Sequence, residues 1–265
     1  MNKVEAVHRP DQVLALTIHR PEARNAFDHE TVLALTRHLK AAAHDPEVRA
    51  VLLTGSGANF CAGGDIKWMQ DILDSPVEHM ARAATDISSM LQAAWALDKP
   101  LVVQLRGAVM GGGIGLVCCA DIAIADSTAL FGLGEVRLGI VPAAISPFVV
   151  RALGTRLATR LALLGEPFGP HQALQHGVIG EITTPADCDA AVERAIAALL
   201  RGGPQAQART KALFRATPRD GDISYQRSID CLVDTWRAPE AGEGLGAFVA
   251  KRRPVWVTTV GKATC

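Results

Sequence analysis

The stretch Leu101–Asp126 reads LVVQLRGAVMGGGIGLVCCADIAIAD, and the rest of the chain is interpreted outward from it. An apolar run of strand composition leads into glycines 111–113 and resumes as a second apolar run. Three adjacent glycines leave backbone without side chains, which suits a ligand that lies against the main chain. If Gly113 opens a helix, the free N–H groups of its first turn favour an anion or a developing oxyanion. A tight helix–sheet packing contact explains the same glycines, and this stretch alone does not separate the two.

A second glycine cluster lies upstream, in the segment GSGANFCAGGDIKWM. It follows a short buried strand predicted over Ala50–Thr54, and Gly63 and Gly64 precede Asp65, which is placed as a helix N-cap. The order strand, glycine turn, helix therefore occurs twice. Two such turns, if they converge, can present two backbone N–H donors to one oxygen, which is what stabilisation of an enolate or tetrahedral oxyanion requires.

The remaining pattern predicts an α/β core followed by a helical tail. Alternation predicts a first strand over Gln12–His19, and helical spacing predicts one helix from the Asp28 N-cap to about Ala43 and another over Val77–Leu97. Further strands are expected at Ile122–Ala125, Ala129–Gly132 and Val178–Ile182, and helices at 148–153, 157–164, 170–176 and 187–200. The rest of the chain, including 211–214, 226–236 and 243–251, is expected to be helical.

Composition narrows the class of protein. The chain has 265 residues with 27 Lys plus Arg against 27 Asp plus Glu, so no global field attracts nucleic acid or an anionic membrane. The apolar run Gly107–Ala120 is too short for a bilayer, and the N-terminus shows no apolar signal core. Six cysteines without CxxC spacing and eight scattered histidines argue against disulfides and metal sites. These features predict a cytoplasmic protein with reduced, buried thiols.

Glu135 is an isolated acid in the otherwise apolar segment FGLGEVRLGIVP. Signatures of P-loop, dinucleotide-binding, zinc-protease and serine-hydrolase sites are absent from the sequence. That leaves Glu135 as the candidate acid–base group beside the two glycine turns. A salt bridge to Arg137 is the alternative role for the same side chain.

Four motifs carry a resemblance, in the order RPEARNAF, NFCAGGDIKWM, GAVMGGGIGLVCCADIAIA and FGLGEVRLGIVP, with the tail EGLGAFVAKRRPVW. They resemble the enoyl-CoA hydratase/isomerase family, the crotonase superfamily. The resemblance implies a crotonase-like α/β spiral of repeated ββα units. It places a catalytic core at residues 1–195 and a C-terminal helical oligomerisation region at 196–265. It also implies a homotrimer or hexamer acting on an acyl-CoA substrate. No metal or redox cofactor is implied, and coenzyme A is part of the substrate.

By the same resemblance, the two oxyanion-hole amides fall on Gly64 and Gly112. Main-chain contacts to the acyl-CoA fall around Ala62, Gly64, Asp65, Ile66 and Lys67, and Arg24 matches a basic position near the CoA phosphates. Phe248 and Lys251 match tail residues that complete a neighbouring subunit's CoA site.

One departure from the family pattern bears on the substrate. Typical hydratases carry two glutamates, but here the first position is Gly115 and only Glu135 remains, while the usual GAGGTQ is replaced by AAISPF. Both changes resemble hydratases of 3-substituted glutaconyl-CoA esters, namely methylglutaconyl-CoA and isohexenylglutaconyl-CoA, in leucine and acyclic terpene breakdown. We expect Gly115 to remove a charge and open space for a branched Cβ. Ile145, Pro147 and Phe148 are expected to line that space.

Two other functions remain open at this point. A double-bond isomerase also needs only one carboxylate to move a proton between two carbons. A non-catalytic or RNA-binding relative of the fold is the second alternative, against which the balanced charge argues.

Overall fold

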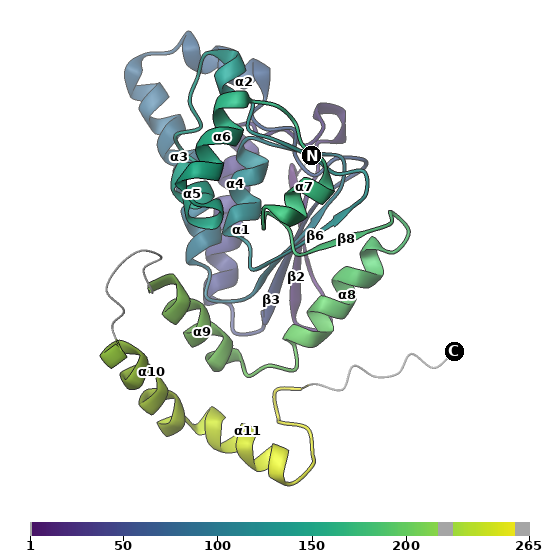
Figure 1. Ribbon diagram of the computed structural model, residues 1–265, viewed down its shortest axis with the longest axis vertical. Helices are drawn as coiled ribbons and strands as arrows, with labels where there is room; N and C mark the ends of the chain where they lie inside the picture. Colours follow the sequence, from purple (N-terminus) through teal and green to yellow (C-terminus); the bar gives the residue numbers. More distant parts are fainter. Residues whose placement is uncertain (1, 217–224, 258–265) are drawn as a thin grey trace.

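The computed structural model describes residues 2–216 and 225–257. It is built on a six-stranded sheet, and helices are arranged around this sheet (Figure 1). The strand order is β1-β2-β3-β4-β6-β8, with β1 antiparallel to β2 and all other neighbours parallel. The strands are β1 (Val4–His8), β2 (Val13–Ile18), β3 (Ala50–Gly55), β4 (Leu101–Leu105), β6 (Ile122–Asp126) and β8 (Glu181–Thr183). A smaller parallel pair is formed by β5 (Ala108–Met110) and β7 (Leu130–Gly132).

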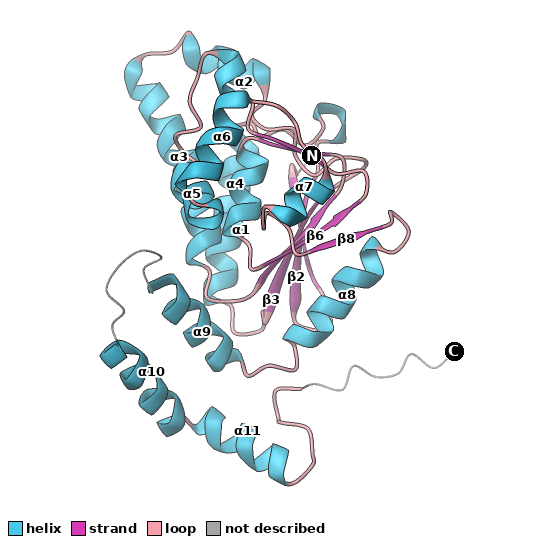
Figure 2. Cartoon of the chain, viewed as in Figure 1, coloured by secondary structure: helices cyan, strands magenta, loops and turns pink. Residues whose placement is uncertain are grey.

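Helices surround the sheet on both faces (Figure 2). They are α1 (His29–His44), α2 (Ile66–Leu73), α3 (Val77–Ala96), α4 (Gly112–Cys119), α5 (Ser146–Leu153), α6 (Thr155–Leu164), α7 (Pro170–Gln175), α8 (Cys188–Leu199), α9 (Pro204–Ala216), α10 (Tyr225–Arg237) and α11 (Pro239–Val249). Two short 3₁₀ helices are η1 (Pro21–Ala23) and η2 (Glu135–Leu138).

The predicted α/β class and the strand–glycine turn–helix order are confirmed. Asp28 caps α1 by accepting from the Thr31 amide, and Asp65 caps α2 by accepting from the amides of Lys67 and Trp68. The helix in the central stretch begins one residue earlier than expected, at Gly112. Strand β1 was not predicted, because only Val4 of its five residues is buried and the strand shows no alternating pattern.

Two apolar clusters hold the layers together. The larger cluster joins one face of the sheet to helices α1, α3, α4 and α5, and the smaller joins the other face to α8. Because α8 spans 188–199 and packs on the sheet, the expected boundary between residues 195 and 196 falls inside this helix.

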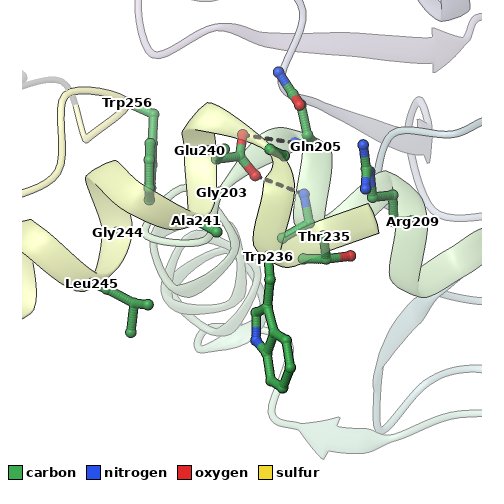
Figure 3. A pocket seen from close by; sticks show the side chains of 12 residues that line it. Gly203, Gln205, Arg209, Thr235, Trp236, Glu240, Ala241, Gly244, Leu245 and Trp256 are labelled. Carbon is green, nitrogen blue, oxygen red and sulfur yellow. Dashed lines mark hydrogen bonds between the residues drawn. The ribbon is translucent and has the colours of Figure 1, made fainter. Parts of the chain in front are cut away.

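The C-terminal helices form an arm whose base is fixed to the core. Lys211 of α9 pairs with Asp121, and Arg215 donates to the Leu97 carbonyl at 2.7 Å. Helices α10 and α11 extend away from the sheet (Figure 1). Glu240 of α11 accepts from the amides of Gln205 and Ala206 at the start of α9, beside a groove of about 290 Å³ (Figure 3).

The arm leaves large apolar side chains in solvent. Phe248 is 82% exposed, and Trp236 and Leu245 beside the groove are 66% and 65% exposed (Figure 3). The tail beyond residue 257, including Cys265, lies outside the described residues.

The five cysteines of the described residues are free, and burial raises the pKa of Cys61 and of Cys118 to about 12. Those two thiols are therefore neutral at physiological pH. None of the helices in the described ranges is both long and apolar enough to cross a bilayer.

Candidate active site

Backbone hydrogen bonds bring three chain segments to one place. The Met110 amide donates to the Cys61 carbonyl at 2.9 Å, which joins the end of β5 to the loop after β3. The Gly111 amide donates to the Gly132 carbonyl at 2.9 Å, which joins that turn to the end of β7. Phe27 donates to Gly63, so the motif before α1 is attached to the same loop. The two glycine turns and the segment that carries Glu135 therefore converge, which is the condition under which the sequence pattern predicts two amides acting on one oxygen.

The convergence encloses a cavity of about 540 Å³ with mostly apolar walls. Its wall includes both glycine turns, one face of α2, Ile87 of α3 and the segment from Gly134 to Ile145. A concave apolar site with few polar groups is the usual form of a small-molecule site.

Gly64 and Gly112 both line the cavity, and each has an unused amide. Among the described residues, neither N–H donates to a protein acceptor. Gly112 is the first residue of α4, where the amide has no partner within the helix. Two unpaired amides on the wall of one cavity provide the donors that stabilisation of an oxyanion requires.

Gly111 is required by its backbone, because its φ is +48° in the turn before α4. It is also required by proximity to the acid, since an added Cβ at Gly111 would lie 3.1 Å from Glu135 Oε1. The carboxylate therefore rests against the glycine turn that carries Gly112.

Glu135 has one carboxylate oxygen without a partner. Oε2 is buried and makes no hydrogen bond, which is uncommon for a buried polar atom in a native structure. Burial raises the pKa of Glu135 above its ordinary value. Oε2 of Glu135, buried and without a hydrogen-bond partner on the cavity wall, is available for proton transfer.

The alternative role of Glu135 is not found. Arg137 makes no ion pair with Glu135, and its Nη2 instead donates to the Leu164 carbonyl at 3.4 Å. Both side chains are part of the cavity wall, within the same 3₁₀ helix η2.

Three of the residues expected to contact coenzyme A, namely Ala62, Gly64 and Ile66, line the cavity, and Arg24, Asp65 and Lys67 do not. The Ala62 amide donates to the carbonyl of Arg24, whose side chain is exposed. Asp65 Oδ2 pairs with Arg20 at 2.8 Å while its other oxygen caps α2, and Lys67 is exposed in the first turn of that helix.

The structure contradicts the expected space at Gly115. An added Cβ there would lie 2.5 Å from Ile145 Cγ2 and 3.1 Å from both Ile145 Cβ and Leu91 Cδ2, so the volume is already filled. Gly115 is absent from the cavity wall, whereas Ile145 is part of it. Phe148 is also absent, because its ring packs toward Trp95 in the core with centroids 6.2 Å apart.

Several wall residues were missed by sequence reasoning. Phe27 lies within the quoted motif RPEARNAF, and its ring faces Gly112, where an added Cβ would be 3.0 Å from Phe27 Cε2. Trp68 and Met69 also line the cavity, and the helical spacing of α2 explains why they do so once the position of the cavity is known. Phe248 and Lys251 are not part of this cavity in their own chain.

Comparisons with known proteins agree with the geometry. Residues 8–259 match the family model described as enoyl-CoA hydratase/isomerase. The 2,3-dehydroadipyl-CoA hydratase of Escherichia coli K12 is 30% identical over 254 residues, covering 94% of this chain and 96% of the relative. Among solved structures, Pseudomonas aeruginosa AtuE has a TM-score of 0.91 at 38% identity and covers 97% of this chain and 100% of its own. An enoyl-CoA hydratase from Shewanella pealeana has a TM-score of 0.91 at 33% identity, covering 96% of each chain.

Proposed function

The chain belongs to the enoyl-CoA hydratase/isomerase family and is a hydro-lyase of the enoyl-CoA hydratase type, and from this premise we propose that it hydrates a 3-substituted glutaconyl-CoA ester. The observation that carries the proposal is Glu135, whose Oε2 is buried and unpaired, on the same cavity wall as two unpaired glycine amides. Methylglutaconyl-CoA and isohexenylglutaconyl-CoA are the substrates that fit the departures in the sequence.

In the proposed mechanism, the amides of Gly64 and Gly112 donate to the thioester oxygen. Glu135 removes a proton from water as the oxygen of that water bonds to Cβ, and the electron pair of the double bond moves into the enolate. The amides hold the enolate oxygen, and one such donor is typically worth about 3 to 4 kcal/mol. Protonated Glu135 then returns the proton to Cα, so the net change is addition of one water molecule.

The walls support a branched acyl group. Behind the main cavity lies a second one of about 150 Å³ between α5 and α6, and the two share Pro142 and Ile145. An apolar branch of the acyl group would therefore pass Ile145 to reach the second cavity. The effect of Gly115 on the substrate is indirect, because its missing side chain lets Ile145 lie against α4.

The name of one relative supports the proposal that the substrate carries a carboxylate at its distal end. The Escherichia coli protein is named for 2,3-dehydroadipyl-CoA, whose acyl group comes from a dicarboxylic acid. This chain has a single acid in the described cavity wall, so a substrate carboxylate meets less repulsion than in a two-acid site.

The test is a panel of enoyl-CoA thioesters with and without a distal carboxylate, followed by loss of the enoyl absorbance. We expect the highest kcat/KM on 3-methylglutaconyl-CoA or a longer 3-alkyl glutaconyl ester. A higher kcat/KM on crotonyl-CoA would remove the glutaconyl substrate and leave the hydratase activity standing.

One other reaction is compatible with a single acid. A relative from Streptococcus mutans, 29% identical, is named a trans-2-decenoyl-[acyl-carrier-protein] isomerase. Product analysis separates the two reactions, because hydration consumes the double bond and isomerisation moves it.

We also propose that Phe248 and Lys251 complete the site of a second copy in a homotrimer or hexamer. The exposure of Phe248 on the arm supports this, since apolar area of this kind marks association surfaces.

A further inference from the structure

Arg137 is the one cationic side chain in the described wall of the cavity. The other charged residue of that wall is Glu135, two positions earlier in η2, and the remaining wall is apolar or backbone. A cation on this wall can pair with an anionic group of a ligand that enters the cavity.

The side chain of Arg137 extends over the C-terminal end of α6. An added Cβ at Gly165 would lie 3.2 Å from both Cγ and Nε of Arg137, so the absence of a side chain at Gly165 leaves room for the arginine stem. The guanidinium makes one long hydrogen bond, from Nη2 to the Leu164 carbonyl at 3.4 Å.

Most of the donor capacity of Arg137 is unused. A guanidinium carries five N–H donors in a planar fork that matches a carboxylate. Across residues 2–216 and 225–257, no Asp or Glu forms an ion pair with Arg137. The side chain is also exposed, so it reaches a ligand without breaking an internal ion pair.

We propose that Arg137 binds the distal carboxylate of a dicarboxylic acyl-CoA substrate and thereby selects it over neutral enoyl esters. This inference rests on the proposed hydratase function and names the cation that the glutaconyl substrate requires. A charge-assisted, fork-shaped contact with a carboxylate contributes more than a neutral hydrogen bond.

The test compares two substrates that differ only in that carboxylate, 3-methylglutaconyl-CoA and 3-methylcrotonyl-CoA. Selectivity is the ratio of their kcat/KM values. We expect Arg137→Leu to lower this ratio by about 10- to 100-fold, chiefly through KM on the glutaconyl ester, because hydrogen bonds to charged groups contribute about 1.5 to 3 kcal/mol. Arg137→Lys should keep part of the ratio. Arg160→Leu, at an exposed arginine of α6 outside the cavity wall, is the matched control and should keep all of it.

Each outcome has a separate meaning. If wild-type enzyme prefers the glutaconyl ester and Arg137→Leu keeps that preference, the role of Arg137 is wrong and the substrate stands. Equal losses on both esters would show that Arg137 supports η2 or contacts the shared CoA part, which also overturns the inference. If wild-type enzyme shows no preference for the glutaconyl ester, the proposed substrate itself fails.

Discussion

The contact between Gly115 and Ile145 makes a quantitative prediction about stability. Gly115 lies inside helix α4, where replacing glycine by alanine normally stabilises by about 0.5 to 1 kcal/mol. Here the new Cβ would lie 2.5 Å from Ile145 Cγ2, against an ordinary carbon–carbon contact of about 3.5 to 4.0 Å. Rotating Ile145 does not relieve the clash, because its Cβ is also too close, at 3.1 Å.

Overpacking of this kind costs about 1 to 3 kcal/mol. With the helix gain subtracted, Gly115→Ala should lower the free energy of unfolding by up to about 2.5 kcal/mol. Ile145→Ala alone should cost about 2 to 5 kcal/mol, because it leaves a cavity. In that background the 2.5 Å contact with Cγ2 is gone while the Cβ at position 145 stays 3.1 Å away, so Gly115→Ala should destabilise less than it does in the wild type.

Urea unfolding of the wild type, both single variants and the double variant measures this cycle. Protein concentration is held constant because association changes apparent stability. We expect a coupling free energy of about 1 to 3 kcal/mol between the two positions. If Gly115→Ala stabilises the wild type, the packing of Ile145 against α4 is wrong.

The remaining predictions concern chemistry and assembly. Glu135→Gln should keep the fold and CoA-ester binding while kcat falls by about 10² to 10⁴, and near wild-type turnover would exclude proton transfer by Glu135. Burial raises the pKa of Glu135. We therefore expect kcat/KM to decrease as the pH is lowered through a pKa that lies above the ordinary range of glutamate. By linkage, protonated Glu135 favours the folded state, and this contribution to stability is lost as the pH rises from the unfolded-state pKa through the raised folded-state pKa. Glu135→Gln does not titrate, so it should gain stability relative to wild type across that pH interval. Gly112→Val should displace the Phe27 ring and abolish turnover in a protein with native circular dichroism, whereas an active variant would remove Gly112 from the oxyanion site. Sedimentation should show a closed oligomer at micromolar concentration, and a stable monomer would contradict an associating role for the arm.

The features that the sequence predicted are those with local signals. The assignment of Gly64, Gly112 and Glu135 to one site came from the family resemblance. Glycine turns, N-cap acids and apolar periodicity placed most of the strands and helices. These features depend on neighbours within a few residues along the chain, so they can be recognised without the fold.

The features that were missed or wrong depend on tertiary packing. The filling of the space at Gly115 by Ile145, and the turn of Phe148 toward Trp95, involve residues about 30 or more positions apart. The sequence pattern indicated only one role for Arg137, a salt bridge to its neighbour Glu135. No local pattern shows that its stem lies over Gly165 instead.

The packing of Ile145 against Gly115 also bears on how this site changes during evolution. A glutamate at position 115, where the family resemblance places a second acid, must displace Ile145, while a smaller residue at 145 alone leaves a void. Either first step is therefore expected to lower the free energy of unfolding. A change between one-acid and two-acid forms of this site then requires coordinated substitution at positions 115 and 145 rather than one replacement alone.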